Sequence, residues 1–220
     1  MHQSYKHYLE IIRNTCTGHE RPVTILPEEQ ADIARLAEDH CTVPFVLPSF
    51  RGTPFYPSML QRTRGMMLNY YQIDQFTRHT VSLLRDNGIN CILLKGISLA
   101  SCYPVPEYRK LGDLDLYISR KSDVSRAQKL LEADGYIAED ELSDHHLTYH
   151  YTFPETGRKL LLELHYRVVG MYQYDRANQI VDRVYSSENL VPASQTINDF
   201  TYSVVLAVVF YALVILAVGY

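Results

Sequence analysis

Residues 112–118, Gly-Asp-Leu-Asp-Leu-Tyr-Ile, constrain the fold of this chain more than any other stretch. Carboxylates alternate here with apolar residues, which is the period of a β-strand with one buried face. Asp113 and Asp115 are therefore predicted to project from the same side of a strand. Two buried carboxylates side by side repel each other unless a cation or a proton lies between them, and their oxygen atoms suit a hard cation such as Mg²⁺. The stretch predicts a strand that carries a metal site.

Two further segments give this strand its context. Upstream, residues 93–98 (Leu-Leu-Lys-Gly-Ile-Ser) have the pattern of a buried strand that runs into a glycine turn and then a helix. Downstream, residues 160–165 (Leu-Leu-Leu-Glu-Leu-His) form another apolar strand, in which Glu163 points away from its leucine neighbours and His165 lies on the same face as Glu163. A strand with a Gly-x-Ser turn, then Asp-x-Asp, then a single strand carboxylate is the order of parts in a metal-dependent nucleotidyltransferase.

The chain resembles a known family on these residues. The segment LLKGISLASCYPVPEYRKLGDLDLYI (93–118), followed by LLLELHYR (160–167), is similar to the bacterial nucleotidyltransferases of the DNA polymerase β-like superfamily. The likeness is greatest to the branch with a Lys-Gly…Tyr-Pro…Arg…Gly-Asp-Leu-Asp signature, and it covers about residues 80–170. The turn departs from the commoner form, in which the glycine is followed directly by Gly or Ser.

The resemblance implies an enzyme that moves a nucleoside monophosphate from a nucleoside triphosphate, such as ATP, to an acceptor hydroxyl. Asp113 and Asp115 are then expected to bridge two Mg²⁺ ions, with Mn²⁺ as an alternative, and Glu163 to complete the shell of the ion that activates the acceptor. The simpler interpretation is that Asp113 and Asp115 form a solvated strand edge and that Glu163 is merely exposed.

Four residues are the expected nucleotide ligands. Gly96 lets the backbone approach a phosphate closely, and Ser98 adds a hydroxyl donor at a helix start. Lys95 directly precedes the turn and either reaches the triphosphate or extends into solvent along apolar surface. Arg109 and Lys110 lie just before the carboxylate strand. Three interpretations fit them: they bind a phosphate, they shield the acids, or they are ordinary charged residues of a loop.

The acceptor is not specified by the sequence. A small molecule of the aminoglycoside kind, a protein hydroxyl and a tRNA end all fit. An Asp-x-Asp glycosyltransferase is the competing enzyme class, and a catalytically degenerate nucleotide-binding or scaffold module is the non-enzymatic alternative. One segment contains several residues of the types that bind metals: Asp144, His145, His146 and His150. Their spacing matches no firm zinc pattern and favours a polar loop.

The composition of the chain limits the classes of partner and the cellular compartment that we expect. The 220 residues carry a net charge of −4 and no Lys/Arg cluster, so broad nucleic-acid binding is not expected. The four cysteines form no Cys-x-x-Cys pair, which fits a reducing compartment. The N-terminus lacks the apolar segment of a secretion signal, and we expect a cytoplasmic protein.

Hydrophobic periodicity predicts an α+β fold, with a mixed twisted sheet and helices packed on it. We expect three regions: a helical N-terminal region (1–88), a nucleotidyltransferase core (89–170) and a C-terminal helical region (171–220). Predicted helices span residues 4–16, 28–41, 57–87, 98–103, 122–134 and 174–185; predicted strands span 89–94 and 114–118, and a hairpin joins 147–153 to 159–165.

The C-terminal segment 200–220 contains no charged residue. Residues 204–218 are predicted to form one helix, which is just long enough to cross a membrane. A buried bundle helix, a membrane segment and a truncated end are the three interpretations of this segment, so membrane association through residues 200–220 stays open.

Overall fold

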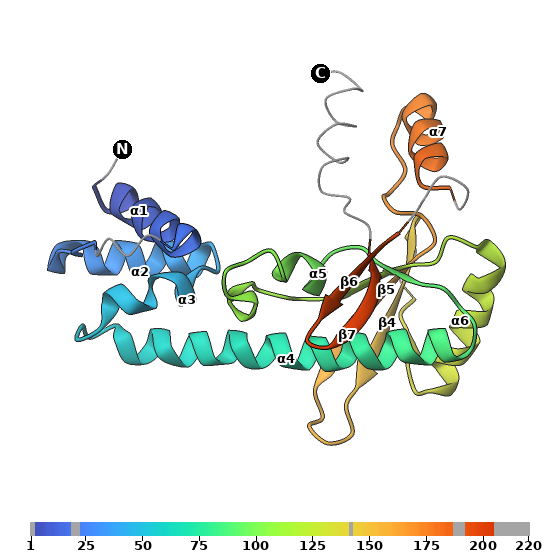
Figure 1. Cartoon of the computed structure of the whole chain (residues 1–220), viewed down its shortest axis with the longest axis horizontal. Helices are drawn as coiled ribbons and strands as arrows, with labels where there is room; N and C mark the ends of the chain where they lie inside the picture. Colours follow the sequence, from blue (N-terminus) through green and yellow to red (C-terminus); the bar gives the residue numbers. More distant parts are fainter. Residues whose placement is uncertain (1–2, 19–22, 141–142, 187–191, 205–220) are drawn as a thin grey trace. The chain divides into compact units, whose positions relative to one another are not determined.

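The computed structural model describes residues 3–18, 23–140, 143–186 and 192–204 (Figure 1). The fold is α+β, with a seven-stranded mixed sheet. The helices are α1 (Gln3–Thr17), α2 (Gln30–Asp39), α3 (Val43–Val46), α4 (Tyr56–Asp86), α5 (Ile97–Ala100), α6 (Lys121–Ala133) and α7 (Asp175–Val184). The strands are β1 (Ile92–Leu93), β2 (Leu114–Tyr117), β3 (Ile137–Ala138), β4 (His146–Thr152), β5 (Lys159–His165), β6 (Ala193–Ile197) and β7 (Phe200–Val204).

Most predicted elements are confirmed, because their signals are local. Helices α1, α2, α4, α6 and α7 lie where the apolar periodicity placed them, and α4 ends before Gly88, whose φ of +71° suits glycine. The hairpin of β4 and β5 is also confirmed. Strand β1 and helix α5 are shorter than predicted.

The chain divides into two compact units. The first contains Met1–Asp74 and Leu99–Leu111, and its core is formed by apolar residues of α1–α3 and the start of α4, among them Tyr8, Ile33 and Phe50. The second contains Gln75–Ser98 and Gly112–Tyr220, and it holds the whole sheet.

The strand order in the sheet is β3-β4-β5-β2-β1-β7-β6. Strands β2 and β5 are parallel neighbours, with Asp115 beside Glu163 and Tyr117 beside His165. Strands β4 and β5 are antiparallel, and His146 pairs with His165. Side chains paired in this way project from the same face. Three neighbouring strands therefore bring acids and histidines together on one face of the sheet.

The opposite face of these strands is apolar. Leu114 and Leu116 of β2 and Leu162 and Leu164 of β5 are almost completely buried. Phe76 of α4 covers this face where it packs on Tyr151, with ring centroids 5.9 Å apart. Because one face is fixed against a helix, the register of the strands cannot slip without moving the polar residues into the core.

The C-terminal part differs from the prediction. Strands β6 and β7 form an antiparallel hairpin, and β7 adds to the sheet in parallel beside β1. Asn198 and Asp199 have positive φ values of 46° and 65° at the hairpin turn, as expected for a tight turn built from these residue types. Val204 ends a strand, so the predicted helix is wrong at its first residue; residues 205–218 lie outside the described residues. In the described part of the chain, no helix combines the length and apolar character that a membrane crossing requires.

Candidate active site

Asp115 is the centre of the polar face. It is fully buried in the middle of β2. Its Oδ1 lies 3.0 Å from Lys95 Nζ and 3.2 Å from His165 Nε2. Its Oδ2 is also buried but has no hydrogen-bond partner among the described residues. A buried carboxylate oxygen without a partner is costly, and it marks a place where a cation would be accommodated.

Glu163 lies next to Asp115 on the parallel strand β5. Its Oε2 is 3.3 Å from His165 Nε2. One ligand atom from each of Asp115, Glu163 and His165 lies within 4.8 Å of the others, which is compatible with a single bound ion. The two sequence-predicted carboxylates on separate strands are thus brought together.

Asp113 precedes β2 and is joined to this group through Lys95. The Lys95 ammonium lies 3.7 Å from Asp113 Oδ2 as well as 3.0 Å from Asp115 Oδ1. Lys95 therefore neutralises both acids of the Asp-x-Asp pair. Its side chain is half exposed, whereas Asp115 is completely buried.

The electrostatics of the site reflect an excess of negative charge. Burial, reinforced by the charges of Asp115 and Asp113, raises the pKa of Glu163. Burial alone would also raise the pKa of Asp115, but the hydrogen bonds from His165 and Lys95 hold it below its ordinary value. Burial likewise opposes the charge of Lys95 and would lower its pKa. The neighbouring acids, of which Asp115 has the largest effect, outweigh burial and raise the pKa of Lys95. Three acids thus surround one permanent cation.

The residues present fit a divalent metal. Carboxylate oxygens are the ligands that Mg²⁺ and Mn²⁺ prefer, and the site offers several of them. Asp115 Oδ2 is buried without a partner among the described residues, and burial together with the neighbouring acids raises the pKa of Glu163. A bound cation would remedy both.

The glycine turn connects β1 to α5. Gly96 has a φ of +70°, a conformation that strains any residue with a Cβ, and a Cβ built there would lie 3.6 Å from the Asp113 carbonyl oxygen. Ser98 is buried; its hydroxyl donates to the Lys95 carbonyl oxygen at 3.4 Å, and its own carbonyl accepts from Gln195 Nε2 at 3.3 Å. The turn thus lies directly beside the start of the carboxylate strand. Arg109 belongs to the other unit, where its guanidinium donates to the Lys110 carbonyl oxygen at 3.5 Å.

A cavity of about 740 Å³ is bordered by the residues that follow β2 and β5. Tyr117 and Tyr166 contribute aromatic surface, and Arg120 and Lys121 add exposed cationic side chains. Tyr117 lies on the same strand face as Asp115, two residues further along β2. No motif in the sequence points to this cavity.

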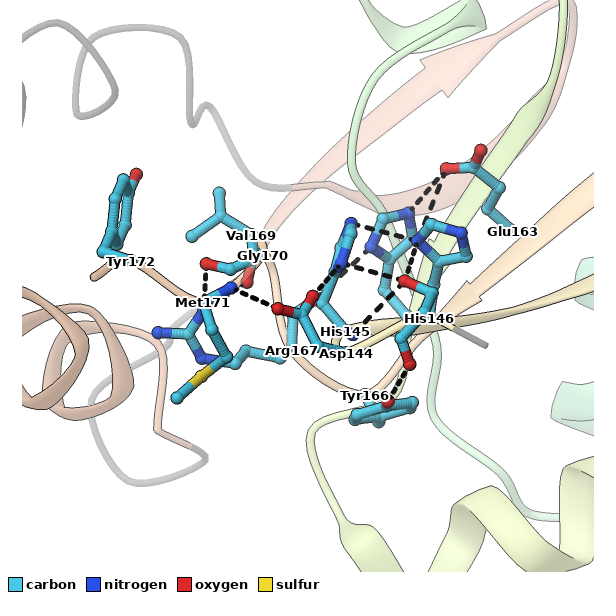
Figure 2. Close-up of polar contacts among 12 residues, drawn as sticks. Asp144, His145, His146, Glu163, Tyr166, Arg167, Val169, Gly170, Met171 and Tyr172 are labelled. Carbon is cyan, nitrogen blue, oxygen red and sulfur yellow. Dashed lines mark hydrogen bonds and ion pairs between the residues drawn. The ribbon is translucent and has the colours of Figure 1, made fainter. Parts of the chain in front are cut away.

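The histidines contribute more to this face than the sequence indicated. His145 and His146, predicted to be loop residues, lie close to His165, and Figure 2 shows them gathered beside Glu163. The signal that could have found them is the hairpin register, because a hairpin across residues 154–157 places His146 opposite His165.

Taken together, buried acids on paired strands and a glycine turn beside them define an enzyme of the nucleotidyltransferase type. Residues 27–195, more than half of the chain, match the family described as uncharacterised nucleotidyltransferase, and this chain belongs to that family. The nucleotidyltransferase resemblance seen in the sequence is confirmed at this level. No curated protein and no solved structure matches the chain significantly.

Proposed function

We propose that this enzyme transfers a nucleoside monophosphate from a nucleoside triphosphate to an acceptor hydroxyl, with Mg²⁺ or Mn²⁺ bound at Asp113, Asp115 and Glu163. The observation that carries the proposal is the pairing of Asp115 with Glu163 on parallel strands, with a buried oxygen of Asp115 left without a partner among the described residues. When bound, two divalent ions would activate the acceptor oxygen and neutralise the pyrophosphate leaving group.

The protein's own contribution is positioning. Asp115 and Glu163 are held on a rigid sheet whose other face is packed, so their carboxylates need little reorganisation to bind a cation. Asp113, about one third exposed, lies at the solvent side of the pair. This arrangement supports Asp113, Asp115 and Glu163 as the residues that would hold the metal, with Glu163 nearest the acceptor.

We assign the triphosphate to the turn beside β2. Gly96 presents backbone without a side chain, and Ser98 offers a hydroxyl and a helix-start amide, as proposed from the sequence. The half-exposed Lys95 side chain can leave the acids for the phosphates once a cation neutralises Asp115. Arg109 is a further proposed nucleotide ligand on the strength of the family signature alone.

The cavity that follows β2 and β5 is our proposed acceptor site. Its exposed cations, Arg120 and Lys121, repel a polycationic acceptor such as an aminoglycoside and favour one that carries negative charge. Of its two tyrosines, Tyr117 is buried, and the partly exposed Tyr166 provides flat apolar surface for a ring. We therefore favour an anionic, ring-containing acceptor over a polycationic small molecule.

The test is an acceptor screen with α-labelled nucleoside triphosphates and Mg²⁺ or Mn²⁺, in which the labelled fraction of a cell extract is identified. We expect label to enter one fraction, pyrophosphate to be released, and both to vanish with Asp113→Asn. Transfer from a sugar nucleotide instead would identify a glycosyltransferase. Tight nucleotide binding with no turnover in any fraction would identify a degenerate module.

A further inference from the structure

Three histidines on the polar face form a group that is not assigned as ligands in the proposed nucleotidyl transfer, although His165 contacts Asp115 and Glu163. His146 is the first residue of β4 and His145 directly precedes it (Figure 2), whereas His165 is the last residue of β5. One ring nitrogen from each of the three lies within 4.8 Å of the others. We propose that His145, His146 and His165 form a second cation site, which takes a transition-metal ion of the Zn²⁺ class rather than Mg²⁺. The proposal goes beyond the proposed function and concerns different chemistry, because imidazole nitrogens suit Zn²⁺ and its neighbours whereas carboxylates suit Mg²⁺.

The ring of His145 is oriented as in known zinc ligands. Its Nδ1 lies 2.7 Å from Asp144 Oδ1, so Nδ1–H donates to a carboxylate and the lone pair of Nε2 is directed toward a metal position. Asp144 is itself fixed, because the backbone N–H of Met171 donates to its Oδ2 at 2.9 Å. A carboxylate–histidine pair directed at a cluster of further histidines is the arrangement that a metal site requires.

His165 is oriented in the same way through the backbone. Its Nδ1 lies 3.3 Å from the Arg167 carbonyl oxygen, which can only accept. Nε2 is therefore the nitrogen left to bind a cation, and it lies 3.2 Å from Asp115 Oδ1 and 3.3 Å from Glu163 Oε2, where the acid group and the histidine group meet. A lone pair pointing at two carboxylates is unfavourable, so a proton or a metal ion must lie at this nitrogen.

The spacing is close to that of a coordination shell. Two nitrogens bound to one tetrahedral Zn²⁺ are separated by about 3.3 Å, given bond lengths near 2.05 Å. In the structure, His145 Nε2 lies 3.0 Å from His146 Nδ1. Glu163 Oε2, 4.0 Å from His146 Nδ1 and 3.3 Å from His165 Nε2, offers a carboxylate for a fourth position. Side-chain shifts of about an ångström would complete a shell of this size.

The backbone around Asp144 leaves room for little else. A Cβ at Gly170 would lie 3.3 Å from Asp144 Oδ1 and 3.5 Å from His145 Nδ1. An alanine there would press on the pair that orients the ring while leaving every proposed ligand in place. Gly170→Ala is therefore a probe of the site that removes no metal-binding atom.

The test uses the full chain, freed of metal and titrated with Co²⁺, whose visible absorption strengthens when it exchanges six waters for a smaller, nitrogen-rich shell. We expect His145→Ala and His146→Ala to weaken Co²⁺ binding by more than about 100-fold, and Asp144→Asn and Gly170→Ala to weaken it by about 10–100-fold, as losses outside the ligand shell do. Zn²⁺ should displace Co²⁺ and abolish the absorption, whereas Mg²⁺ should not.

The matched control is His150→Ala. His150 lies on the same strand, β4, but its ring pairs with Glu139, and we expect the variant to bind Co²⁺ like the wild type. Asp113→Asn, which disables the carboxylate site, should also retain the Co²⁺ absorption; this separates the present proposal from the proposed function. Equal Co²⁺ affinity in the wild type and the His145 and His146 variants would overturn the proposal.

A second measurement covers variants that fail to fold. X-ray absorption of the wild type loaded with one equivalent of Zn²⁺ counts its ligands directly. We expect at least two imidazole ligands. A shell made of oxygen alone would mean that the three rings form only a hydrogen-bonded chain from Asp144, and the proposal would be wrong.

Discussion

Replacing Lys95 is the best test of whether the acids form a cation-binding site. In the structure the Lys95 ammonium is the permanent positive charge in contact with both Asp113 and Asp115. Lys95→Met removes the charge but keeps most of the side-chain volume. The metal-free protein should then be destabilised, because a fully buried carboxylate loses its closest charged partner.

The distances give the size of the effect. At an effective dielectric constant near 20, contacts of 3.0 and 3.7 Å correspond to about 5.5 and 4.5 kcal/mol of gross Coulomb attraction. Desolvation of the partners offsets most of this. Breaking a buried pair costs about 3–5 kcal/mol and an exposed one about 0–1 kcal/mol. Since Lys95 is half exposed and Asp115 fully buried, we expect a loss of about 2 kcal/mol, or about 4–8 °C in Tm.

The assay is urea unfolding followed by far-ultraviolet circular dichroism, with EDTA or with Mg²⁺. A cation bound by Asp113, Asp115 and Glu163 takes over the neutralising role of Lys95. The difference between wild type and variant should therefore shrink to about 0.5 kcal/mol or less in saturating Mg²⁺. At a hundredfold excess over its Kd, Mg²⁺ should itself stabilise the variant by about 2.7 kcal/mol.

Lys129→Met is the control, because Lys129 is exposed on α6 and should change the free energy of unfolding by less than about 0.5 kcal/mol under both conditions. A loss for Lys95→Met that is equally large with EDTA and with Mg²⁺ would refute the reasoning. Lys95 would then be a structural partner of the acids that no metal replaces.

Three further predictions concern the same face. Asp113→Asn should abolish nucleotidyl transfer while leaving the unfolding transition near that of the wild type, since it removes one of three mutually repelling charges; residual transfer above background would contradict its assignment as a metal ligand. Gly96→Val should eliminate nucleotide binding in calorimetry with Mg²⁺, because φ is +70° there, and Ser98→Ala should weaken binding by about 1 kcal/mol; wild-type affinity in Gly96→Val would move the phosphates elsewhere. The pKa of the Glu163 carboxyl is raised in the folded metal-free protein, so between pH 4.5 and that raised pKa the folded protein binds more protons than the unfolded chain. The free energy of unfolding should therefore fall as the pH rises from the ordinary value of 4.5 through the raised pKa. Glu163→Gln should flatten that fall in chemical unfolding measured across pH, and an unchanged slope would show that Glu163 is not its source.

The sequence predicts the carboxylates well because their signal is local. Alternation of period two places Asp115 and Glu163 on polar strand faces, opposite leucines that must be buried. The sequence pattern does not predict that β2 and β5 pair in parallel, with Asp115 and Glu163 side by side. That pairing joins segments about fifty residues apart, and it depends on the packing of the whole sheet rather than on any one segment.

The C-terminal hairpin was missed for a different reason. Asn198 and Asp199 are turn residues flanked by β-branched and aromatic residues, which is a hairpin signal. The uncharged run that follows outweighed it and led to a helix prediction that includes Val204. Hydrophobicity alone does not distinguish a buried strand from a buried helix, so the short turn was the better guide here.

The hairpin of β4 and β5 decides how the polar face is divided. Glu163 and His165 are two residues apart on β5, so both project from one face, and each meets a different neighbour: Asp115 across β2 and His146 across β4. Among the described residues, His165 belongs both to the acid-rich group and to the histidine group. A shift of β4 by one residue would move His146 to the apolar face and separate it from the histidine group. The pairing of Asp115 with Glu163 would remain, because it lies on the other side of β5. The carboxylate site and the histidine site are therefore separable by register although both include Glu163 and meet at the His165 imidazole.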